Sequence, residues 1–192
     1  MLGAVWGARG QGALVYDQQS ANGYVPPNIS MYIQPNEPMG QSFIPSLASV
    51  GFVQLEVGDS VTLNGIGATL HVNLLANSIT GTVLASTAPV FMPDNFFGMT
   101  TFLFSTAVSL TPGTTYYFQP VVESGNHWVV NTLGSVYPRG SAFFNGTADL
   151  NNDFWFREGT VVPEPSASWL ILIGGGVFFY VRRKDNKRCS HS

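Results

Sequence analysis

An apolar run near the C-terminus, Ala167 to Val181, divides this chain into a long body and a short charged end. About fifteen residues of helix reach about 22 Å, which is a short membrane span. Directly before the run, Val162-Pro163-Glu164-Pro165-Ser166 predicts a stiff, extended spacer, because each proline fixes φ and lacks an N–H. Directly after it, Arg182-Arg183-Lys184 favours the cytoplasm. This order predicts a single C-terminal transmembrane helix with the body outside the cytoplasm.

These parts together resemble the PEP-CTERM sorting signal of Gram-negative bacteria that make exopolysaccharide. Pro163-Glu164-Pro165 matches the signature, and the apolar run and basic end follow in order, so residues 161–192 are interpreted as one signal. The resemblance implies that an exosortase, a membrane-embedded cysteine transpeptidase, cuts near the motif. It therefore implies an inner-membrane precursor with a periplasmic body, and a mature form that is extracellular or attached to the envelope. An ordinary anchor after a proline-rich linker is the alternative.

The N-terminal residues 1–13 are small and mildly apolar, and they are interpreted as the back half of a signal peptide. No positively charged segment precedes the apolar stretch, so we expect the true translation start to lie upstream of Met1. An unstructured terminus is the alternative. A signal peptide agrees with export across the inner membrane.

Charge is distributed unevenly along the chain. Ten of the eleven acidic residues precede the apolar run, whereas five of the eight basic residues follow it. Between positions 14 and 160 the basic residues are Arg139 and Arg157. Nucleic-acid phosphates need cationic partners, so we expect no binding of DNA or RNA. The single cysteine, Cys189, follows the run, so we expect neither an intramolecular disulfide nor a thiolate metal cluster.

Residues 14–160 are enough for one domain, and their many Gly, Thr, Val, Phe and Asn residues favour strands over helices. Leu70, Val72 and Leu74 alternate with polar residues, as in a half-buried strand. A second half-buried strand is predicted with Val50 and Phe52 on its buried side and Gln54 and Glu56 on its polar side. Further strands are expected at 82–85, 100–105, 115–122, 127–131, 142–144 and 154–157. The spacing predicts an all-β, antiparallel two-sheet β-sandwich.

A turn centred on Pro112-Gly113 predicts a hairpin between residues 102–110 and 116–118. The order of the pieces is similar to the jelly-roll-like sandwiches of secreted bacterial anchor proteins. The segments that carry this resemblance are Gln41 to Phe43, Ala68 to Leu75, Gly81 to Ala85, Leu110 to Tyr116, Tyr137 to Gly140 and Ala142-Phe143. It implies a carbohydrate-binding-like sandwich, a fold that hosts many unrelated functions.

Catalytic chemistry is sparse in this sequence. His71 lies in the polar phase of its strand and His127 in a turn, so both are interpreted as surface residues. Neither a nucleophile elbow nor a paired-histidine metalloprotease helix is found. A glycosidase needs two carboxylates in one cleft, and those available include Asp59, Asp94, Glu123 and Asp153. We therefore predict no enzymatic activity and no catalytic residues.

Two binding hypotheses arise from the body. Oxygen-bearing side chains alternate at Asp149, Asn151 and Asp153, a pattern that could hold a calcium ion. The favoured interpretation is a simple turn, in which these side chains bond to the nearby backbone. Three large aromatic residues would stack on sugar rings if exposed and pack in the core if buried: Trp128, Tyr137 and Trp155. The favoured function is a structural protein of the envelope or exopolysaccharide matrix, without cofactor. The alternative is an extracellular carbohydrate-binding module, assisted by calcium.

Overall fold

The structure of the protein, a computed structural model, describes residues 12–20 and 29–163. The chain divides into two units, and the larger, Leu14–Val161, is a β-sandwich. The smaller unit, Met1–Ala13 with Val162–Ser192, lies almost wholly outside the described residues. The predicted transmembrane run and basic end lie outside them too. In the part of the chain that is described, no helix is both long and apolar enough to span a membrane.

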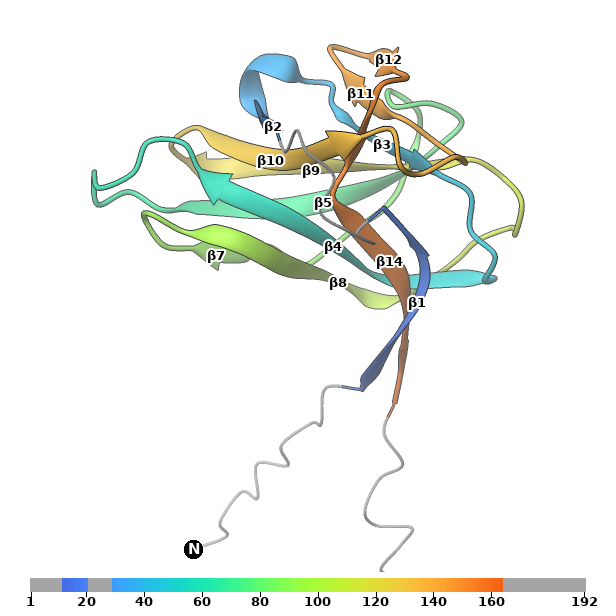
Figure 1. The fold of residues 1–192 in the computed structure, drawn as a ribbon. Helices are drawn as coiled ribbons and strands as arrows, with labels where there is room; N and C mark the ends of the chain where they lie inside the picture. Colours follow the sequence, from blue (N-terminus) through green and yellow to red (C-terminus); the bar gives the residue numbers. More distant parts are fainter. Residues whose placement is uncertain (1–11, 21–28, 164–192) are drawn as a thin grey trace, which may run out of the picture. The chain divides into compact units, whose positions relative to one another are not determined.

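Two seven-stranded antiparallel sheets form the larger unit (Figure 1). Sheet A contains β1 (Ala13–Gln19), β2 (Ile29–Tyr32), β4 (Ser49–Asp59), β8 (Phe97–Ser109), β10 (Trp128–Gly134), β13 (Asn152–Phe154) and β14 (Phe156–Val162). Sheet B contains β3 (Gly40–Phe43), β5 (Ala68–Ala76), β6 (Val83–Ser86), β7 (Val90–Met92), β9 (Tyr116–Gly125), β11 (Ala142–Phe144) and β12 (Thr147–Asp149). A short 3-10 helix, η1 (Gln34–Asn36), follows β2. The predicted all-β fold of two antiparallel sheets is confirmed.

β4 is the central strand of sheet A. β8 pairs with one edge of β4 over residues 49–58, while β14 and then β10 pair with the other edge. Side chains on both faces of β4 are buried, and Phe52 and Leu55 are each 0% exposed. The core contains Val53 and Leu55, whereas Phe52 and Gln54 point to the outer face. Val50 lies in the core and Gln54 on the outer face, as predicted. The predicted placement of Phe52 on the side of Val50 was wrong, because the pairing register shifts between these two residues.

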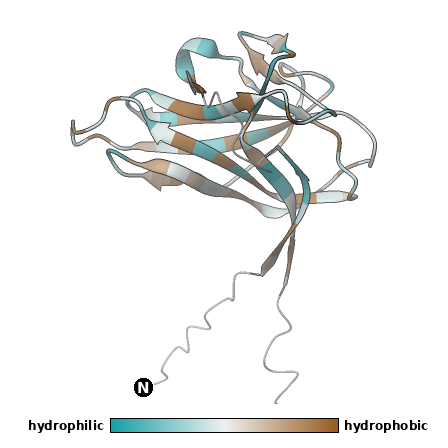
Figure 2. Ribbon diagram, in the orientation of Figure 1, coloured by the Kyte–Doolittle hydropathy of each residue, from teal (hydrophilic) through white to brown (hydrophobic). Residues whose placement is uncertain are grey.

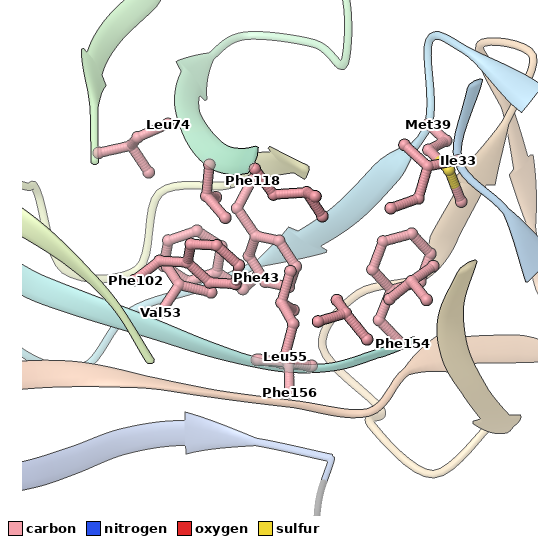
Figure 3. Packing of buried hydrophobic residues seen from close by; sticks show 14 of the residues in the cluster. Ile33, Met39, Phe43, Val53, Leu55, Leu74, Phe102, Phe118, Phe154 and Phe156 are labelled. Atoms are coloured by element: carbon pink, nitrogen blue, oxygen red, sulfur yellow. The ribbon is translucent and has the colours of Figure 1, made fainter. Parts of the chain in front are cut away.

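Aromatic rings fill the space between the sheets. Phe118 of β9 lies 5.2 Å from Phe156 of β14 and 6.0 Å from Phe43 of β3, measured between ring centroids. Figure 3 shows these rings packed with aliphatic residues of the same cluster, such as Leu55. Figure 2 shows hydrophobic and hydrophilic residues alternating along several strands. Each fully buried Phe or Leu side chain contributes about 1.5–3 kcal/mol to folding.

The predicted hairpin between residues 102–110 and 116–118 is wrong. β8 pairs with β4 in sheet A, whereas β9 pairs with β3 and β5 in sheet B. The turn between them therefore joins the two sheets. Gly113 N donates to Pro45 O at 3.0 Å, and Gly113 has a φ of +82°, which favours glycine. A Pro-Gly pair signals a chain reversal, but it does not tell whether the flanking strands pair with each other.

Gly40 of β3 lies where β3 and β9 approach closely. A Cβ at this position would overlap the backbone oxygen of Phe118 and lie 2.6 Å from Ile79 Cδ1. We expect Gly40→Ala to lower the free energy of unfolding by about 1–3 kcal/mol, because overpacking forces β3 to shift. Urea denaturation followed by circular dichroism measures this change.

Gly134→Ala is the matched control, since nothing lies within 4 Å of a Cβ built on Gly134. Its free energy of unfolding should stay within about 0.5 kcal/mol of the wild-type value. Equal stability of the two variants would contradict the close packing of β3 against β9.

Candidate functional site

β14 carries the chain from the sandwich into the predicted sorting motif. The strand ends at Val162, which is 46% exposed, and Pro163 follows it at the surface. The motif residues Glu164, Pro165 and Ser166 and the basic residues Arg182, Arg183 and Lys184 lie outside the described residues. β14 itself lies between β1 and β4 in sheet A. The motif therefore begins on a strand that is paired on both edges.

Ser20, at the end of β1, fixes the start of β14. Ser20 N donates to Phe156 O at 3.1 Å, and Phe156 N donates to Ser20 Oγ at 3.0 Å. The Ser20 hydroxyl in turn donates to Phe154 O. Further along the strand, a Cβ on Gly159 would overlap Val15 O, so glycine lets β1 approach β14 closely. β1 thus holds the strand that leads into the motif.

Asp17 and Gln18 tie β1 to the segment that follows β3. Asp17 Oδ2 accepts from Ser46 N at 2.7 Å. The Tyr137 hydroxyl donates to Gln18 Oε1 at 3.2 Å and accepts from Ile44 N at 3.1 Å. Burial is the main cause that raises the pKa of Tyr137, so its hydroxyl stays protonated at neutral pH. These bonds link β1 to the segment after β3, both directly and through Tyr137.

Glu158 of β14 is a buried carboxyl group. Its side chain is 0% exposed, and neither carboxyl oxygen has a hydrogen-bond partner among the described residues. It lies opposite Val53, on the core side of the sheet. Desolvation, with a smaller contribution from the charge of Asp17, raises the pKa of Glu158 to about 8, and the nearby Gln18 backbone offsets only part of this rise. Glu158 is therefore mostly protonated at neutral pH.

Two of the three aromatic residues considered for sugar stacking are buried. Trp128 is 0% exposed and stacks on Phe96, with ring centroids 6.2 Å apart. Tyr137 is 4% exposed and meets Phe156 edge-on at 5.2 Å. Burial assigns both rings to packing, which corrects their predicted stacking role. Trp155, between β13 and β14, is half-buried and keeps that predicted role.

The three predicted calcium ligands serve different parts of the fold. Asp153 is 0% exposed, and its carboxylate accepts from Gln41 Nε2 at 2.9 Å and from two backbone N–H groups at 2.8 Å. Burial raises the pKa of Asp153 despite these donors. Asp149 instead accepts from Asn151 N at 2.9 Å within its turn. Among residues 12–20 and 29–163, no group of three His, Cys, Asp or Glu could hold a metal ion. Calcium binding stays a prediction, and calorimetric titration tests it.

The other residues considered as catalytic groups lie on sheet B and near the end of β4. His71 of β5 lies with Nδ1 2.8 Å from Glu123 Oε1 of β9, on sheet B. Asp59 ends β4, in sheet A, and Asp94 lies in the loop before β8. The Gly65 N–H, which donates to Asp94 Oδ2 at 2.7 Å, is the main cause that lowers the pKa of Asp94. Asp94 is therefore ionised at neutral pH, and its hydrogen bond links the loop before β8 to the loop that contains Gly65.

Sequence reasoning missed an aromatic and polar group on the outer face of sheet A. Arg157 lies opposite Gln54, and its guanidinium carbon is 5.2 Å from the ring centroids of both Tyr16 and Trp155. Phe156, next to Arg157 in the chain, points to the core. Alternation along residues 154–157 was the signal that would have placed Trp155 and Arg157 on one face.

Comparison with known proteins identifies the C-terminal part of the chain. Residues 161–184 match the family model of the PEP-CTERM protein-sorting motif. No curated protein matches the chain significantly. The protein is thus an all-β sandwich that carries a PEP-CTERM sorting motif. Such motifs are recognised by exosortase, a membrane processing enzyme, and imply a secreted, envelope-targeted protein.

The raised pKa of Glu158 makes stability depend on pH. The stability that its neutral form provides is fully present below the unfolded-state pKa of about 4.5 and is lost as pH rises through about 8. The full shift corresponds to roughly 5 kcal/mol, as an order of magnitude. We expect the free energy of unfolding to fall between pH 5 and pH 8.5, and Glu158→Gln to remove most of this fall. Urea denaturation at several pH values measures it.

Glu37→Gln is the control, because Glu37 is exposed. This variant should keep the wild-type pH dependence. The same steep fall in Glu158→Gln as in Glu37→Gln would show that another group causes the dependence.

Proposed function

We propose that the protein is a structural component of the cell envelope or of an exopolysaccharide matrix. It is made as a membrane-bound precursor with the sandwich in the periplasm, and an exosortase processes it at the PEP-CTERM motif. The observation that supports this proposal most strongly is the continuity of β14 with the motif, since the match begins at residue 161 and β14 ends at Val162. Cleavage near the motif would release or transfer an intact sandwich.

The buried polar residues of the sandwich support a scaffold role. Gln41 Oε1 accepts from Phe154 N at 2.9 Å, and Gln41 Nε2 donates to Asp153. Ser20 bridges β1 and β14 in the same manner. These groups satisfy backbone and side-chain partners inside the domain, as structural polar residues do. They stabilise the fold without an intramolecular disulfide, since a disulfide needs two cysteines and the sequence contains one.

A carbohydrate-binding module is the second candidate, and the outer face of sheet A favours it. Tyr16 is 44% exposed there and Trp155 is half-buried, and both rings lie 5.2 Å from the guanidinium carbon of Arg157. Aromatic rings suit the apolar faces of sugars. The two functions are compatible, because a matrix protein gains retention from binding the glycan around it.

Mass spectrometry of the mature C-terminus tests the proposed sorting. The protein is isolated from its native host, with and without the exosortase gene, and analysed intact and as peptides. We expect loss of everything after about Pro165 only when the enzyme is present. An intact tail in both strains would leave a plain membrane-anchored domain and contradict the proposal.

Replacing Pro163, Glu164 and Pro165 together by alanine should preserve the full tail in the strain that has the exosortase. Lys187→Ala with Arg188→Ala is the control, since these residues lie beyond the matched residues 161–184. This control should be processed as the wild type is. Failure of both variants to be processed would indicate a defect in export and not in motif recognition.

A further inference from the structure

The outer face of sheet A gathers polar side chains from neighbouring strands. Arg157 of β14, Gln54 of β4 and Thr101 of β8 lie in register across three strands. Glu56, two residues along β4, accepts a hydrogen bond from Asn131 Nδ2 of β10. The strands β10, β4, β14 and β1 lie side by side in Figure 1. Gln54 and Asn131 are buried, so we define the Arg157 face by the side chains that keep exposed surface, Tyr16, Glu56, Trp155 and Arg157.

Two aromatic rings hold the side chain of Arg157. Its guanidinium carbon lies 5.2 Å from each of the Tyr16 and Trp155 ring centroids, within the range of cation–π attraction. Among the described residues the only ion pair joins His71 to Glu123, and Arg157 Nε has no hydrogen-bond partner there. Aromatic rings therefore fix the cation, and no carboxylate of residues 12–20 and 29–163 lies within ion-pair distance of it.

A cation at this position is unusual for this body. Between residues 14 and 160 the Lys and Arg residues are Arg139 and Arg157, and Arg139 is exposed in the turn before β11. The Arg157 face thus combines a fixed positive charge, the exposed ring of Tyr16, the half-buried ring of Trp155 and the half-buried carboxylate of Glu56. A sugar ring with an apolar face, hydroxyl groups and an acidic substituent complements all of these features.

We propose that the Arg157 face binds a saccharide that carries a carboxylate, of the uronic acid class, within an extracellular glycan. The sugar ring packs against Tyr16 and Trp155, its carboxylate pairs with the guanidinium of Arg157, and its hydroxyl groups donate to the carboxylate of Glu56. The inference rests on the carbohydrate-binding candidate and deepens it by naming the site and the charge of the ligand.

Isothermal titration calorimetry of the full chain in mild detergent tests the inference. The probes are an oligogalacturonate of about ten sugars and its methyl ester of the same length, which has the same rings without the charge. We expect the acid to bind at least about tenfold more tightly than the ester, which corresponds to about 1.4 kcal/mol. Trp155→Ala should weaken the binding of both probes.

Arg157→Gln should abolish the preference for the acid, whereas Arg139→Gln, which removes the same charge elsewhere, should keep it. Circular dichroism confirms that each variant is folded, and Tyr16→Ala provides a second test of the face. Equal affinity for acid and ester would overturn the acidic class, and absence of binding, or unchanged binding in Arg157→Gln, would overturn the site. None of these outcomes alters the mature C-terminus, so sorting is judged separately.

Discussion

The rest of the sandwich depends on the antiparallel pairing of β14 with β4. This pairing aligns Phe156 with Leu55 and Arg157 with Gln54. Successive side chains of a strand point to opposite faces, so one strand has two roles. Phe156 closes the core against Phe118, while the neighbouring Arg157 is presented on the outer face. The same strand then leads into the sorting motif, so the strand that closes the core is also the one that continues into the signal.

Glu158, on the same strand, is a buried acid whose charged form is destabilised by burial. The strand alternation that directs Phe156 to the core also directs Glu158 there, opposite Val53. A charged carboxylate at such a position would lack the hydrogen bonds that compensate burial, so the group is protonated instead. Asp153 is buried as well, but Gln41 and two backbone N–H groups solvate its carboxylate. Of these two buried acids, Glu158 is therefore the one through which pH most directly affects β14.

Some features were predictable from sequence because they are linear. The sorting motif is a fixed order of segments, and β5 shows a clear alternation of Leu70, Val72 and Leu74 with polar residues. Other features depend on pairings distant in sequence. The face of Phe52 in β4 was predicted wrongly because the pairing register shifts after Val50. The hairpin was predicted wrongly because turn residues do not specify the partner strand. The Arg157 face was missed because it brings together Tyr16, Glu56 and Arg157 only through the order of strands in the sheet.

The charge of the body decides how an acidic glycan could be held. Most charges of the sandwich are negative, so a polyanion gains nothing from long-range attraction. At physiological ionic strength the Debye length is about 8 Å, which screens most of this repulsion but leaves a direct contact with a fixed guanidinium largely intact. Binding would then depend on stacking and on Arg157 rather than on net charge. Such a surface recognises an acidic sugar by short-range contacts and not by attraction between opposite net charges.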